Sequence, residues 1–140
     1  GIHVAEILAG EHPPLVRQEN ITRCIYTRLE AASIGLSEEQ AKEAGYDVKV
    51  TQSAFQGNAK ALIKGENEGI IKLVIDQTYG EILGAFIVGP HATDLIGEVL
   101  GVKASEGTIY ELSEIIQPHP ALLEAIGEGA DAYFGSAIHM

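Results

Sequence analysis

The sequence predicts an α+β fold, in which an antiparallel β-sheet carries helices packed on one side. Predicted strands are grouped in the middle of the chain, whereas predicted helices come mainly toward its end, and this segregation is typical of that fold class. The two clearest strands, over residues 68–76 and 81–88, are joined by the polar turn 76–80, which ends in glycine and predicts an antiparallel hairpin. The chain of 140 residues has the size of one ordinary domain.

The first half of the chain is expected to alternate between short helices and strands. Its predicted elements are, in order, a helix over 1–10 within a weakly anchored arm, a strand over 22–27, a helix over 38–44, and strands over 46–54 and 59–64. The helix prediction at Ser37 depends on a capping box, in which the Ser37 hydroxyl and the Gln40 side chain satisfy each other's backbone amides.

The second half begins with the strand 81–88, which is apolar on both faces and is therefore expected at the centre of the sheet. Gly84 and Gly89 indicate close backbone approaches or a bulge. Three helices should follow: one opening within 89–94 and burying Leu95, Ile96, Val99 and Leu100, one over 108–115 opened by a Thr108/Glu111 capping box, and one from Pro120 to about Gly127. Gly127 and Gly129 are expected to weaken the last helix and to leave residues 131–140 loosely held.

Composition narrows the possible partners. The net charge of −11 argues against binding to nucleic acid or to anionic membrane surfaces, and no apolar run approaches the length of a bilayer span. Cys24 is the only cysteine, which excludes an internal disulfide and a self-contained dithiol redox centre, and indicates a reducing compartment.

The strongest chemical signal is a histidine between two prolines. Pro118 and Pro120 stiffen the backbone around His119, and Pro120 suits the first position of a helix, which makes His119 the expected N-cap. Glu124 follows about one turn later, and a carboxylate bound to one ring nitrogen would fix the tautomer and raise the basicity of the other. His119 and Glu124 could thus form an oriented general base. The alternative is a capping histidine beside a solvated glutamate.

Other motifs are missing. No glycine-rich dinucleotide loop or Walker-type loop follows a strand, and no serine lies in a nucleophile elbow. His91, His119 and His139 lack the spacing of metal ligands, so no metal site is expected, and His91 is interpreted as a helix cap.

Three separated stretches resemble the C-terminal interface domain of the dihydrolipoamide dehydrogenases, which are flavin disulfide oxidoreductases. They are residues 24–41, residues 83–90 with 93–96, and His119-Pro120 followed by Glu124 as in the His-Pro-x-x-x-Glu signature. The resemblance covers about residues 21–130 in register. Gln117 stands where the family frequently has a histidine.

The resemblance implies an oxidoreductase that uses FAD, a redox-active disulfide and NAD to reoxidise protein-bound dihydrolipoamide. It implies a homodimer in which His119 is the acid/base toward the thiols at the other subunit's flavin site, Glu124 orients it, and the His119-Pro120 backbone lies near the cofactor. The implied partner is the lipoyl domain of 2-oxo acid dehydrogenase complexes, and the implied location is cytoplasmic.

By the same resemblance, residues 1–20 correspond to the end of a flavin-binding domain and residues 21–140 to the interface, or dimerisation, domain. The flavin-binding and NAD-binding regions and the redox cysteines have no counterpart here, so we expect this chain to bind neither cofactor and to be inactive alone. Three alternatives stay open: a purely structural dimerisation module, the same domain from a glutathione or mercuric reductase relative, and an unrelated small-molecule-binding domain whose His/Glu pair transfers protons by itself.

Overall fold

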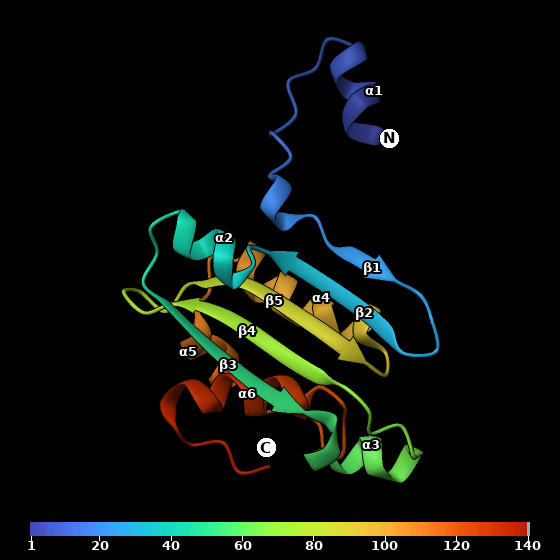
Figure 1. Ribbon diagram of the computed structural model, residues 1–140. Coiled ribbons are helices and arrows are strands. Elements are labelled where there is room, and N and C mark those ends of the chain that lie inside the picture. The colour runs from blue at the N-terminus through green and yellow to red at the C-terminus, as the bar shows by residue number, and fades with distance from the viewer. Residues whose placement is uncertain (140) are drawn as a thin grey trace.

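The computed structural model describes residues 1–139, and a five-stranded antiparallel sheet lies at its centre (Figure 1). The strands are β1 (Arg23–Ile25), β2 (Glu30–Gly35), β3 (Val48–Ala54), β4 (Ile70–Asp76) and β5 (Ile82–Gly89). Their order across the sheet is β1-β2-β5-β4-β3, with every neighbouring pair antiparallel. The most apolar strand, β5, therefore occupies the central position that its sequence predicts.

The longer helices cover one face of this sheet. The helices are α1 (Ile2–Leu8), α2 (Glu38–Glu43), α3 (Ala59–Lys64), α4 (Ala92–Ala104), α5 (Ile109–Glu114) and α6 (Glu124–Phe134). In Figure 1, α4, α5 and α6 lie behind the sheet, whereas the short α2 lies on the opposite face. The predicted α+β fold is confirmed, because the strands form one antiparallel sheet and the main helices pack together on one side.

The hydrophobic core lies between the sheet and these three helices. Alternate residues of β4, namely Ile71, Leu73 and Ile75, are fully buried on the helix side, as their period of two predicts. A smaller cluster on the other face joins Val74 and Leu83 to Ala41 of α2. Both faces of β4 and β5 are thus covered near the middle of the sheet.

Two glycines of β5 allow the backbone approaches that the sequence predicts. A Cβ at Gly84 would lie 2.1 Å from the Leu36 carbonyl oxygen. Gly89 has a φ of 156°, and its Cβ would lie 2.4 Å from a ring carbon of Phe55. Any side chain at either position would therefore displace a neighbouring segment.

Two predicted elements differ from the structure, and one strand has no counterpart in the prediction. Residues 59–64 form helix α3 and not a strand, because the Asn58 side chain accepts the Ala61 N–H at the N-terminus and Gly65 ends the helix in the left-handed conformation. The last helix spans 124–134 and not 120–127, so its N-cap is Leu123 and not His119. Strand β2 was not predicted at all.

The C-terminal segment is more ordered than its glycines predict. α6 continues through Gly127 and Gly129, and the amides of Ile138 and His139 both donate to the Glu128 carboxylate. The expectation of a loosely held segment over 131–140 is therefore wrong for the residues that the structure describes.

The N-terminal arm contributes nothing to the core. No residue of α1 is buried, and Figure 1 shows α1 projecting away from the sheet. Among residues 1–139, no helix has both the length and the apolar character needed to cross a bilayer.

Candidate functional site

His119 lies on the segment between α5 and α6 and is paired with Glu124. Its Nδ1 lies 2.8 Å from Oε1 of Glu124, the first residue of α6, and the His119–Pro120 peptide bond is cis. An ionised carboxylate can only accept a hydrogen bond, so Nδ1 carries the proton and, in the neutral ring, Nε2 is free to accept one. The His119 side chain is 73% exposed, whereas that of Glu124 is 30% exposed. The expected contact is present, although His119 is not a helix cap.

Both oxygens of Glu124 are engaged. Oε2 accepts the backbone N–H of Ala121 at 2.8 Å. Burial by itself would raise the pKa of Glu124, but the hydrogen bonds from Ala121 and His119, together with the charges of His119 and His139, outweigh it and lower the pKa. Glu124 is therefore ionised near neutral pH, which is the state that can orient the imidazole.

The segment on either side of His119 is tied to other elements. The Asn58 amide donates to the Ala121 carbonyl at 2.9 Å, and the Gln117 amide donates to Glu98 of α4. Burial raises the pKa of Glu98, and its second oxygen is buried without a partner among residues 1–139. Gln117, which stands where the family frequently has histidine, thus still acts as a hydrogen-bond donor.

A second His/Glu pair, which sequence reasoning missed, lies beside the first. His139 Nδ1 is 3.0 Å from Oε1 of Glu128, and both residues line the same cavity of about 100 Å³ as His119 and Glu124. The available signal was the spacing of the two glutamates, since positions 124 and 128 fall on one face of a helix.

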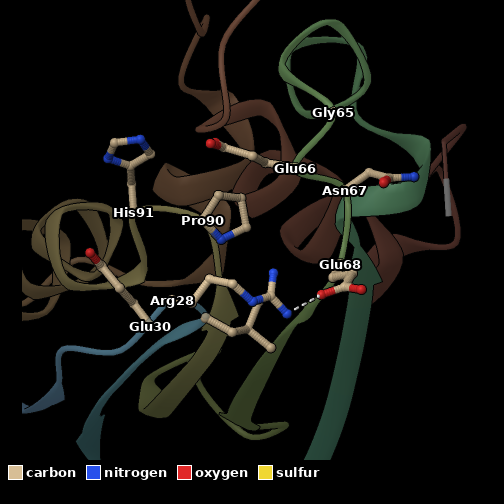
Figure 2. Close-up of a pocket in the computed structure, with 9 residues that line it drawn as sticks. Arg28, Glu30, Gly65, Glu66, Asn67, Glu68, Pro90 and His91 are labelled. Atoms are coloured by element: carbon tan, nitrogen blue, oxygen red, sulfur yellow. Dashed lines mark hydrogen bonds and ion pairs between the residues drawn. The ribbon is translucent and has the colours of Figure 1, made fainter.

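A larger cavity of about 430 Å³ lies at the C-terminal end of β5 and contains none of the predicted site residues. Figure 2 shows Arg28 directed toward Glu68, and the two side chains form an ion pair at 3.0 Å. His91 lines this cavity, and its Nε2 lies 2.7 Å from Lys64 Nζ. The cavity lining combines two basic side chains, Arg28 and His91, with three acidic side chains, Glu30, Glu66 and Glu68.

His91 occupies the N-cap position of α4, but its side chain makes no capping hydrogen bond. Glu30 satisfies this end of the helix instead, because its Oε2 accepts both the N–H and the hydroxyl of Thr93. The prediction that His91 caps the helix is therefore right for its position and wrong for its side chain. Within residues 1–139, no cluster of three or more His, Cys, Asp or Glu side chains could hold a metal ion.

The sequence model of the pyridine nucleotide-disulphide oxidoreductase dimerisation domain matches residues 21–130. The chain belongs to this family. The resemblance to this interface domain, which the sequence indicated, is thus confirmed. The dimerisation domain also has relatives among curated proteins. It is 43% identical to a dihydrolipoyl dehydrogenase of Bacillus subtilis strain 168 over 139 residues, and 39% identical to that of Zymomonas mobilis over 140 residues. Each match takes in 99% of the chain, which spans 29% and 30% of the two relatives' lengths.

Solved structures share the fold of this dimerisation domain. LpdA from Mycobacterium tuberculosis superimposes with a TM-score of 0.82 over 93% of the chain and 28% of LpdA. The HOCl-induced flavoprotein disulfide reductase RclA from Escherichia coli also gives a TM-score of 0.82, over 91% of the chain and 30% of RclA. Both are 22% identical in sequence, so this likeness concerns the fold alone.

Proposed function

We propose that this chain is the dimerisation domain of a dihydrolipoyl dehydrogenase and that it supplies an acid/base histidine to the active site of a second subunit. Residues 21–140 form the interface domain in this proposal, and residues 1–20 form the end of the flavin-binding domain. The relatives' names support the activity, and the family supports the homodimer. The isolated chain is then inactive, because its single cysteine cannot form a redox disulfide.

The observation that carries the proposal is the asymmetry of the His119 ring. Nδ1 is held by Glu124, which is itself held by the Ala121 amide, whereas the side chain is 73% exposed. Nε2 is therefore free to accept a proton, on a ring that is oriented by Glu124 and largely exposed. In dihydrolipoamide oxidation, it would take the proton of a substrate thiol, and the resulting thiolate is the nucleophile for disulfide exchange. Glu124 stabilises the imidazolium that forms and keeps the ring in one orientation.

FAD and NAD belong to other regions of the enzyme in this proposal, and the flavin supplies the two-electron transfer between dithiol and nicotinamide. This domain fits that division, because the backbone at His119-Pro120 lies on an exposed segment and the cavity beside it holds only about 100 Å³. A cavity of that size is too small to enclose a flavin, so His119 and Pro120 would only border a cofactor bound elsewhere.

The alternatives make different demands on the site. A small-molecule-binding domain that uses His119 by itself needs a deep pocket around the ring, and the small cavity and high exposure count against it. A purely structural dimerisation module needs no oriented imidazole, so the Glu124 contact favours the catalytic proposal over it. Glutathione or mercuric reductase chemistry stays an alternative, because the disulfide substrate is bound elsewhere. The lipoyl domain as partner and a cytoplasmic location belong to this proposal as well.

A chimera tests the proposal. The matched region of the B. subtilis relative is replaced by this chain, and NAD-linked dihydrolipoamide oxidation is measured for the chimera and for its His119→Gln variant. Loss of a general base should lower the thiol-side rate by about 10²–10⁴-fold. NADH oxidation by an artificial electron acceptor, which involves no thiol, should stay within about twofold of the parent chimera.

The matched control is His91→Gln, another exposed histidine, which lies outside the cavity of His119. Its thiol-side rate should equal that of the parent chimera. An unchanged dihydrolipoamide rate in His119→Gln would remove this histidine from the mechanism. Equal losses with dihydrolipoamide and with the artificial acceptor would favour the purely structural module.

A further inference from the structure

Three side chains of β3 and the side chain of Asn58 donate hydrogen bonds to backbone carbonyls of α6 and of the segment just before it. Lys49 donates to Tyr133, Thr51 to Gly129, Ser53 to Ala125, and Asn58 to Ala121, at distances of 2.6, 2.7, 2.6 and 2.9 Å. The acceptors are spaced by four residues without exception. We call this set the carbonyl ladder.

The regular spacing follows from the geometry of the two elements. Every second residue of a strand faces the same way and advances by about 6.8 Å, whereas four residues of an α-helix advance by about 6.0 Å. Lys49, Thr51 and Ser53 therefore keep step with α6, which runs antiparallel to β3. Inside the helix, the Ala125 and Gly129 carbonyls can accept a second hydrogen bond besides the intrahelical one, because each oxygen has two lone pairs.

The last donor of the carbonyl ladder differs from the others, because its acceptor precedes the helix. Ala121 lies two residues after His119, and its own N–H is one of the two donors to Glu124. Asn58 is buried, and its Oδ1 accepts the Ala61 N–H at the start of α3. One amide thus joins the N-terminus of α3 to the backbone that holds the His119–Glu124 pair.

We propose that Asn58 is a positioning residue for the His119–Glu124 pair and acts through Ala121. This inference rests on the proposed function for its catalytic meaning, but its structural content can be tested without any turnover. When the Asn58 donor is lost, the Ala121 backbone is free to move, and the Ala121 N–H leaves Glu124. The carboxylate then holds the imidazole less firmly, and Nε2 no longer has one fixed position.

The first experiment uses the 140-residue chain and follows the Glu124 carboxyl carbon by NMR as pH is lowered. Asn58→Ser keeps a hydroxyl that can cap α3, adds no charge, and is too short to reach Ala121. We expect the pKa of Glu124 to rise toward its ordinary value in this variant, because one of the hydrogen bonds that lowers it is lost. The control is Thr51→Val, which removes the carbonyl-ladder donor to Gly129 and should leave the pKa of Glu124 unchanged.

This comparison separates positioning from general destabilisation, since each variant loses one donor of the carbonyl ladder and should unfold at a lower temperature. If Asn58→Ser is too unstable to study, Asn58→Asp keeps the shape and the cap while removing the donor. Its measurement is amide hydrogen exchange at Ala121, because the new carboxylate would itself perturb Glu124. Exchange should accelerate at least tenfold relative to Thr51→Val.

The second experiment places Asn58→Ser in the chimera. Misplacement of a catalytic group by about 1 Å can lower the rate up to 10²-fold, so we expect a 10- to 100-fold loss with dihydrolipoamide and none with the artificial acceptor. An unchanged Glu124 pKa or unchanged Ala121 exchange would overturn the positioning role, whatever His119 does. A shifted pKa of Glu124 in Asn58→Ser, together with an unchanged dihydrolipoamide rate in His119→Gln, would instead sustain the positioning role and refute the proposed function.

Discussion

Replacing the two glycines of α6 by alanine should change stability in opposite directions. Gly127 and Gly129 lie two residues apart in the same helix, so both gain the same helix propensity, about 1 kcal/mol, on substitution. Their surroundings differ. A Cβ at position 127 would meet only the Gln117 Cγ at 4.0 Å, an ordinary contact, whereas at position 129 it would lie 3.2 Å from Ser53 Oγ and 3.6 Å from Leu73 Cδ1.

The magnitudes decide the sign. Gly127→Ala keeps nearly all of the propensity gain and should raise the unfolding temperature by roughly 3 °C for a chain of this size. Gly129→Ala must displace the Ser53 hydroxyl from its hydrogen bond to Ala125, at a cost of about 1 kcal/mol, and overpacking adds about 1–3 kcal/mol. The net result is a loss of about 1–3 kcal/mol, so the two variants should differ by about 2–4 kcal/mol.

The free energy of unfolding of both variants is measured by urea titration, with circular dichroism as the signal. Gly129→Ala is also combined with Ser53→Ala in a double-mutant cycle. Removal of the hydroxyl relieves the crowding, so Gly129→Ala should be less destabilising in the Ser53→Ala background than in the parent chain, by about 1 kcal/mol or more. Equal stabilisation by both glycine replacements would show that α6 does not pack on β3 at the observed distance. An additive cycle would show that Ser53 is not the group that Gly129 accommodates.

Two further predictions concern electrostatics and helix ends. Glu124 has a lowered pKa in the folded chain, so its stabilising contribution is present above the pKa of the unfolded state and is lost as pH falls through the folded pKa. Glu124→Gln should therefore lose less free energy of unfolding than the parent chain between pH 7 and pH 3.5, as measured by urea titration. An equal loss in the two proteins would contradict the prediction. Replacing Ser37 or Thr108 of the capping boxes by alanine should each lower the free energy of unfolding by about 1 kcal/mol, measured by thermal unfolding. The control is Ser105→Ala at the end of α4, which removes no side-chain cap and should change the free energy of unfolding by less than about 0.5 kcal/mol.

Local signals predicted the parts of the fold that local physics determines. The alternation of β4, the two-sided apolar character of β5 and the two capping boxes each follow from short stretches of sequence, and each is present. Helix α3 also had local signals, an Asn cap at residue 58 and Gly65 at its end, which were outweighed by the expectation of another strand. Strand β2 contains Ala31, Ala32 and Ser33, which have weak β propensity, and it forms because β5 and β1 pair with it.

The predicted end of the last helix was wrong because tertiary contacts, and not local sequence, determine the extent of α6. Glycine lowers helix propensity, so the sequence predicts an early end to the helix, yet Gly129 is required where α6 lies against Ser53 and Leu73. The contact of His119 with Glu124 follows from a spacing of five residues and was therefore predictable. The contacts of Ala121 with Asn58 and of Gln117 with Glu98 join positions 63 and 19 residues apart, and no local pattern encodes them.

The surroundings of His119 fit the proposal that this histidine belongs to a site completed by another chain. The ring lies between long-range anchors at Gln117 and Ala121, so its position is determined, yet it remains exposed. The neighbouring Ile115 and Ile116 are 39% and 97% exposed, so apolar surface is uncovered on the same segment of the chain. A site complete within one chain would bury both groups in a pocket. A rigid acid/base atom beside uncovered apolar surface is what a half-site donated across a dimer interface requires, and this combination supports the proposed role more than the His/Glu pairing alone.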